Sequence, residues 1–181
     1  MFYLAKQKIK NSQMKNRLFL LILVLTVKLA SAQNLPPDSP AYKRFPTIPP
    51  FSILQADSST LTKNQLKQHQ ATLIMYFSPD CDHCKHQWAE MEKRMKELKK
   101  YQIVMVTYQP FSEMVDFYKV HKIAEHHNVI MGRDTKFFLP PYYKMQSLPF
   151  QALYDKNGEL ITTFEGNVQI DKLLEAFNRK Q

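Results

Sequence analysis

The chain has 181 residues, a formal net charge of +9 and only two cysteines. Six of its 25 basic residues and none of its 16 acidic ones lie in the first 32 residues. Without that segment the net charge falls to about +3, so charge gives no reason to propose nucleic-acid binding. Two cysteines are too few for a disulfide-stapled scaffold, and the remaining roughly 150 residues suit one domain with its own core.

The N-terminal segment has the pattern of a secretory leader. Residues 18–27 form an apolar run that follows basic residues, and Ala30-Ser31-Ala32 is a small-residue cleavage pattern. The pattern predicts a signal peptide over residues 1–32, because the run is too short to span a bilayer comfortably. We expect no stable membrane insertion after cleavage. An uncleaved anchor is the alternative, and Met14 is a second candidate start.

The first part of the mature chain alternates between extended and apolar segments. Residues 33–50 contain six prolines and should form an extended, poorly helical lead-in. Residues 51–55 predict a short strand, and residues 63–69 a short helix. Residues 72–77 are apolar almost throughout, which predicts a buried central strand.

A helix is predicted next, because apolar residues recur at helical spacing from Cys84 onward. They are Trp88, Met91, Met95 and Leu98. Residues 103–107 predict a second buried strand, residues 114–123 a helix and residues 129–131 a short strand. Pro140 and Pro141 should end any helix that begins after residue 134.

The C-terminal part predicts a hairpin followed by a helix. Residues 150–154 and 160–164 flank an Asn-Gly turn signal, since these residues adopt the positive φ angles of a tight turn. Apolar residues then mark one face of a helix over residues 170–177. This order of elements predicts one α/β domain over residues 51–181, with a mixed sheet sandwiched by helices.

The two cysteines, Cys81 and Cys84, lie in one Cys-Asp-His-Cys run between the predicted central strand and helix. A structural disulfide normally closes a much longer loop, because more unfolded-chain entropy is then removed. A cysteine at a helix N-terminus is also near the positive end of the helix dipole and free N–H groups, which favour the thiolate. The run therefore indicates redox chemistry, with Cys81 as nucleophile and Cys84 as resolving thiol.

Three segments, in this order, resemble those of a known family. Residues 77–84 are similar to the active-site segment of thioredoxin-fold proteins, and residues 147–150 resemble their cis-proline loop. Residues 154–158 resemble the Asp-x-x-Gly tail of the TlpA/ResA-like secreted thioredoxins, and the start near residue 49 is also similar. The resemblance covers residues 46–178. It implies an α/β, thioredoxin-like three-layer sandwich, with a mixed central sheet flanked by helices.

The resemblance also implies a function. It predicts an extracytoplasmic, periplasmic thiol–disulfide oxidoreductase that exchanges disulfides with protein dithiols without a cofactor. The resemblance favours the reductase direction, and oxidation or isomerisation stays open because of His83. Cys81 would attack a substrate disulfide and Cys84 would release the product. Pro149, if cis, would shape the substrate loop; an ordinary trans proline that begins a strand is the alternative. An upstream membrane thiol carrier would supply the electrons.

The neighbours of the cysteines should tune the redox poise. His83 would favour a Cys81 thiolate, whereas Asp80 and Asp82 would disfavour it, so the sign of their sum stays open. In thioredoxins a tryptophan commonly holds the position of Asp80, and a buried acid that of Met75. The proton acceptor for the resolving thiol is therefore unassigned.

The same residues also suggest three other functions. A copper or zinc metallochaperone would use a soft ligand set of Cys81, Cys84, His83 and His86. A dithiol without a well-spaced further ligand makes an incomplete site, however. A peroxidase is a weaker fit, since Ser78 matches part of the peroxiredoxin motif but Ile74 replaces its proline. A thioredoxin-like binding module is the third alternative, and the intact cysteine pair argues against it.

Overall fold

The computed structural model describes residue 36 and residues 39–179, and a compact unit begins at Pro40. The predicted signal peptide, residues 1–32, lies outside the described residues. In the described part of the chain, no helix is long and apolar enough to cross a membrane.

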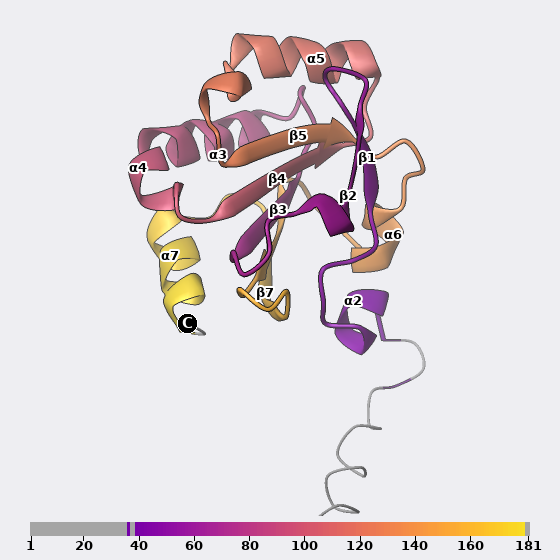
Figure 1. Ribbon diagram of the computed structural model, residues 1–181, viewed down its shortest axis with the longest axis vertical. Helices are drawn as coiled ribbons and strands as arrows, with labels where there is room; N and C mark the ends of the chain where they lie inside the picture. Colours follow the sequence, from indigo (N-terminus) through magenta and orange to yellow (C-terminus); the bar gives the residue numbers. More distant parts are fainter. Residues whose placement is uncertain (1–35, 37–38, 180–181) are drawn as a thin grey trace, which may run out of the picture. The chain divides into compact units, whose positions relative to one another are not determined.

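A seven-stranded mixed sheet forms the centre of this unit, in the order β2-β1-β5-β4-β3-β6-β7 (Figure 1). Its strands are β1 (Ser52–Gln55), β2 (Thr60–Thr62), β3 (Thr72–Tyr76), β4 (Gln102–Thr107), β5 (Val129–Arg133), β6 (Phe150–Tyr154) and β7 (Leu160–Glu165). The central pairs β3–β4 and β4–β5 are parallel, and the outer pairs are antiparallel. The predicted mixed sheet is confirmed.

Helices cover both faces of the sheet (Figure 1). One face packs against α3 (Asp82–Lys93), α4 (Met95–Leu98), α5 (Phe111–Val120) and α7 (Ile170–Asn178). The other packs against α2 (Ala41–Arg44), the 3-10 turn η1 (Lys63–Gln65) and α6 (Leu139–Tyr143). A second 3-10 turn, η2 (Ile123–Glu125), precedes β5. The three-layer sandwich expected from the resemblance is confirmed.

The pattern of burial explains why the central strand reads as one apolar run. Along β3, Leu73 and Met75 face the α3 side of the sheet, whereas Ile74 and Tyr76 face the α6 side. All four are at most 1% exposed. Because both faces are covered, neither set can be polar, and each such large side chain contributes about 1.5–3 kcal/mol by burial.

Two helix predictions need correction. The helix predicted over residues 63–69 is only the 3-10 turn η1, which Thr62 and Gln65 cap reciprocally. The helix predicted from Cys84 through Leu98 is interrupted at Arg94, whose φ of −109° and ψ of 23° lie outside the helical range. Arg94 binds Glu97 at 2.6 Å and Asp171 of α7 at 2.5 Å, so the break coincides with a side-chain bridge between helices.

Prolines were also misread. Pro140 and Pro141 do not end a helix but lie in the first turn of α6, where a missing N–H costs nothing. The lead-in is not extended throughout, since α2 follows Pro40. The lead-in also packs on the sheet: Thr47 forms a β-bridge with Glu159.

The β-strand predictions were closer, with two differences. Strand β2 was missed; its three residues are too short to show a pattern, and it forms only by pairing with β1. The predicted hairpin exists as β6–β7, but Gly158, at φ 78°, is its one turn residue of positive φ. Asp155 also stabilises the turn, because its carboxylate accepts hydrogen bonds from the N–H groups of Asn157 and Glu159.

Candidate active site

Cys81 is the N-cap residue of α3, and its sulfur lies at the start of that helix. The Cys84 N–H donates to Cys81 Sγ at 3.2 Å, and the Cys81 carbonyl accepts the first helical bond from Lys85. The short loop from β3 is closed by the Cys81 N–H, which donates to the Ser78 carbonyl at 3.1 Å. A backbone donor directed at Sγ stabilises negative charge there, as at other helix N-termini.

The two thiols differ in access to solvent. Both are free, but Cys81 is half-buried whereas Cys84 is 0% exposed. Burial, and next the hydrogen bond with Cys81, raises the pKa of the Cys84 thiol to about 12. At neutral pH the Cys81 sulfur is therefore accessible to solvent, whereas the Cys84 thiol is buried and protonated.

The loop before β6 lies opposite Cys81. The Leu148–Pro149 peptide bond is cis, and the Leu148 carbonyl oxygen is 4.0 Å from Cys81 Sγ. Glu165, at the end of β7, accepts from the Ser147 N–H and hydroxyl, both at 3.1 Å. The Gly166 N–H donates to the Pro149 carbonyl at 2.9 Å. The end of β7 thus holds the loop that faces Cys81 Sγ.

The three residues predicted to tune the poise are all exposed. Asp82 is an exposed partner of Lys85 at 3.4 Å, an ion pair that contributes little in solvent. His83 does not use its Nδ1 on Cys81: this atom is 2.9 Å from Oδ1 of Asn167, in the turn between β7 and α7. Any influence of His83 on the sulfur therefore depends on how that turn holds the ring.

Comparison with known proteins identifies the family. The model of the AhpC/TSA family matches residues 46–173, about seven-tenths of the chain. The chain belongs to the AhpC/TSA family. This membership makes it a thioredoxin-like oxidoreductase. No curated protein matches the sequence significantly.

Solved structures support the same fold for this AhpC/TSA member. The exposed lipoprotein thioredoxin of Streptococcus pneumoniae is 21% identical with a TM-score of 0.55, over 69% of this chain and 97% of that one. StoA of Bacillus subtilis is 20% identical with a TM-score of 0.56, over 72% and 98%. A secreted Mycobacterium tuberculosis disulfide oxidoreductase homologous to E. coli DsbE is 14% identical with a TM-score of 0.59, over 70% and 93%.

A network of buried amides connects α3 to the turn after β7, and sequence reasoning missed it. The Gln87 side chain, 1% exposed, accepts from the Val168 N–H at 2.7 Å and donates to the Val168 carbonyl at 3.1 Å. Gln151, 0% exposed, donates to the Gly166 carbonyl at 3.1 Å. One signal was available: Gln87 is three residues after Cys84, on the same apolar face of the helix.

The position of the missing acid is apolar in this family member. Met75 is 0% exposed and belongs to the same core cluster as Cys84. Its cross-strand neighbour is Gln151, whose Oε1 is buried and has no hydrogen-bond partner among the described residues. The polar atom nearest to the missing acid along the sheet is therefore a neutral amide.

The residues of the alternative functions have other surroundings. Among the described residues, no three His, Cys, Asp or Glu side chains are grouped so that they could hold a metal ion. The two histidines of the suggested ligand set, His83 and His86, are both exposed. The Ser78 hydroxyl accepts from Gln109 at 3.3 Å, and Ile74 is a fully buried strand residue.

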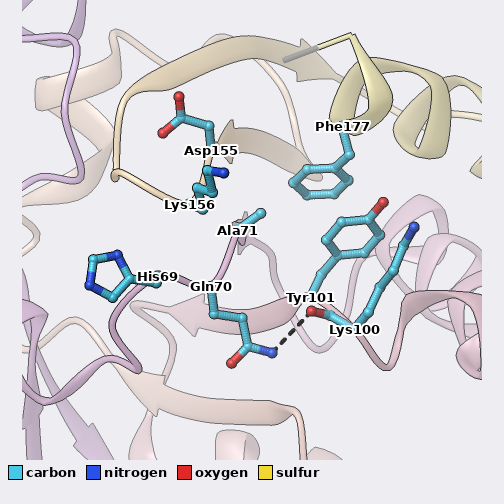
Figure 2. A pocket seen from close by; sticks show the side chains of 8 residues that line it. All are labelled: His69, Gln70, Ala71, Lys100, Tyr101, Asp155, Lys156 and Phe177. Carbon is cyan, nitrogen blue, oxygen red and sulfur yellow. Dashed lines mark hydrogen bonds between the residues drawn. The ribbon is translucent and has the colours of Figure 1, made fainter. Parts of the chain in front are cut away.

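A cavity of about 230 Å³ lies at the end of the sheet away from the two thiols. Figure 2 shows the side chains that line it. The cavity is lined by His69, Gln70, Ala71, Lys100, Tyr101, Asp155, Lys156 and Phe177. The stacked rings of Tyr101 and Phe177, with centroids 3.9 Å apart, form one wall (Figure 2). Ala71 immediately precedes β3, whereas Cys81 follows its carboxyl end, so about 17 Å of strand separates the cavity from the thiols.

Proposed function

We propose that the chain is an extracytoplasmic thiol–disulfide oxidoreductase that exchanges disulfides with protein dithiols through Cys81 and Cys84. The observation that carries the proposal is the asymmetry of the pair at the start of α3. Cys81 is accessible and receives a backbone N–H, whereas Cys84 is buried within hydrogen-bonding distance of it. The loop that faces Cys81 Sγ, with the Leu148 carbonyl oxygen 4.0 Å away, supports the same proposal.

In the reductase direction, the Cys81 thiolate attacks one sulfur of a substrate disulfide. A Cys81–substrate bond forms, the substrate S–S bond breaks, and the departing sulfur takes a proton from solvent. Cys84 then loses its proton and attacks Cys81 Sγ. This step releases the second substrate thiolate and leaves a Cys81–Cys84 disulfide, so that the two steps together transfer two electrons to the substrate. The enzyme must then be reduced again by a dithiol donor, which we propose to be a membrane thiol carrier.

The raised pKa of Cys84 explains why this thiol reacts second. While Cys84 is protonated, it cannot compete with Cys81 for the substrate disulfide. Cys84 approaches Cys81 from the protein side, whereas the substrate reaches it from solvent. The buried thiol thus acts only after the mixed disulfide has formed, which limits the reaction to one entry point.

The proposed compartment is the periplasm. The predicted leader over residues 1–32 supports export, and an exported site can meet protein disulfides that the cytoplasm does not sustain. Export is tested by determining the N-terminus of the protein recovered outside the cytoplasm, which should begin at Gln33. An intact leader on the recovered protein would contradict the cleavage.

A trapping experiment tests the chemistry. The Cys84→Ser variant should accumulate mixed disulfides with a disulfide-bonded peptide, detectable as a mass increase that a reductant removes. The Cys81→Ser variant should form none, because its remaining thiol is buried and protonated. Trapping through Cys84 alone, or the absence of any adduct on the wild type and both variants, would contradict the proposal.

The reduction potential decides the direction of exchange. A value at or below about −250 mV, in the range of thioredoxin, supports a reductase that needs a donor. A value above about −180 mV would make the protein an oxidant or isomerase and would overturn the reductase direction while leaving the exchange chemistry intact.

A further inference from the structure

Asn167 contacts His83 through both ends of its side-chain amide, although the two residues are 84 positions apart. Asn167 Nδ2 donates to the His83 backbone carbonyl at 2.6 Å, and Asn167 Oδ1 lies 2.9 Å from His83 Nδ1. His83 is in the first turn of α3, two residues after Cys81. One amide thus binds both the backbone and the ring of His83, which lies between the two cysteines in the sequence.

The backbone contact fixes the direction of the amide. A carbonyl oxygen can only accept, so the Asn167 atom beside the His83 carbonyl must be the NH₂ group. The other end, which faces His83 Nδ1, is then the oxygen, which can only accept. His83 Nδ1 must therefore carry the proton. In the neutral ring this leaves Nε2 unprotonated, the reverse of the tautomer that free histidine prefers.

The turn that presents Asn167 is itself held on both sides. Gln151 donates to the carbonyl of Gly166, and Gln87 bonds both backbone groups of Val168. Gly166 has a φ of 74°, which a glycine adopts without strain. The amide of Asn167 is therefore fixed by two buried side chains from β6 and α3, and does not depend on a freely moving loop.

We propose that Asn167 is a positioning residue of the redox site, which holds the His83 ring as its Nδ1–H tautomer on the first turn of α3. The functional consequence rests on the proposed thiol–disulfide exchange. With Nδ1–H committed to Asn167, the ring cannot use this donor on Cys81. His83 then acts on the sulfur from one fixed place, so its contribution to the redox poise requires Asn167.

The tautomer itself is the first test, and it needs no activity. The ¹H–¹⁵N two-bond spectrum of His83 in the reduced full-length protein is recorded at about pH 8.5, above the ordinary histidine range near 6.5. We expect a protonated Nδ1 and a bare Nε2. In Asn167→Ala the ring should revert to the Nε2–H form.

Gln169→Ala is the matched control, because Gln169 is an exposed residue of the same turn and makes no side-chain cap bond. Its spectrum should equal that of the wild type. A wild-type ring in the Nε2–H form, or a tautomer that Asn167→Ala leaves unchanged, would overturn the proposal. The same spectra report whether each variant is folded.

The second test measures the equilibrium constant of the Cys81/Cys84 pair with glutathione in Asn167→Ala, His83→Ala and the double variant. Both single variants should shift this constant in the same direction, Asn167→Ala by about three- to tenfold, the size expected for one lost hydrogen bond. The double variant should equal His83→Ala. A shift by Asn167→Ala that persists without His83, or no shift by His83→Ala, would refute the role. A protein that exchanges no disulfide would refute the proposed function but leave the tautomer result standing.

Discussion

The protection of the Cys84 thiol, which we propose to be the resolving thiol, follows directly from its burial. We consider the Cys81→Ser variant, in which Cys84 is the one remaining thiol. An unfolded thiol has a pKa of about 8.5, so about a quarter is thiolate at pH 8. In the wild-type protein burial, and next the hydrogen bond with Cys81, raises the pKa of Cys84 to about 12; the substitution removes the Cys81 thiol but keeps burial, the larger cause, so the thiolate of Cys84 stays a small minority at that pH. Since the thiolate is the nucleophile, alkylation should be slower than in unfolded protein by about 10²-fold or more.

The assay is the rate of iodoacetamide labelling at pH 8, followed by mass spectrometry, for native and denatured Cys81→Ser. Cys84→Ser is the matched control, since its single thiol, Cys81, is accessible and should label readily in the native state. A native Cys84 that reacts within about tenfold of the denatured rate would refute both the burial and the raised pKa.

The same shift predicts how stability depends on pH. The folded pKa of Cys84 lies above its unfolded value, so the reduced protein is favoured while the thiol is protonated. This contribution is fully present below about pH 8.5 and is lost as the pH rises toward 12. At pH 9 the free energy of unfolding should fall by about 1 kcal/mol per pH unit. The Cys84→Ala variant should lack this slope between pH 8.5 and 9.5, and urea unfolding measures it; an unchanged slope would refute the linkage.

Three further predictions concern the scaffold, each measured by urea unfolding. Gln87→Leu should lower the free energy of unfolding by about 1–3 kcal/mol, because it leaves both Val168 backbone groups unpaired. A loss below about 0.5 kcal/mol, the usual size of a surface effect, would contradict the network. Trp88→Ala should lower the free energy of unfolding by about 3–5 kcal/mol, since Trp88 is 0% exposed. A small loss would contradict its role in the core. Gly132→Ala should cost about 1–3 kcal/mol, because the new Cβ would lie 2.9 Å from Ile53; combining it with Ile53→Ala should give less than the sum, and additivity would exclude the clash.

The sequence predicted correctly those helices and strands that follow from a pattern within one short segment. The buried strand β3 and the helix after it follow from apolar periodicity within one segment, and the β6–β7 hairpin from a turn signal. Trp88 was expected in the core for the same reason and is fully buried. The errors arose where a local rule has two meanings. Proline ends a helix from inside but begins one from its first turn, and Pro140 does the latter.

The motif was visible in the sequence, but the contacts around it were not. Cys81 and Cys84 are neighbours along the chain, so their spacing and position could be assessed directly. Asn167 lies in a polar turn whose sequence resembles any other connection, and its contact with His83 exists only because β7 ends beside α3. No pattern within a window of ordinary length could have joined two residues 84 positions apart.

The proposed redox site combines few charges with several neutral amides. Asp80, Asp82 and His83 are exposed, so their effects on Cys81 are partly screened by solvent and salt. The buried contacts that fix the surrounding backbone are instead made by Gln87 and Gln151. A carboxylate or lysine at either position would carry a desolvation cost and would alter the charge around both thiols. Amides can hold the turn against α3 without adding charge, which leaves the poise of the pair to the helix N-terminus and to the one ring that the turn positions.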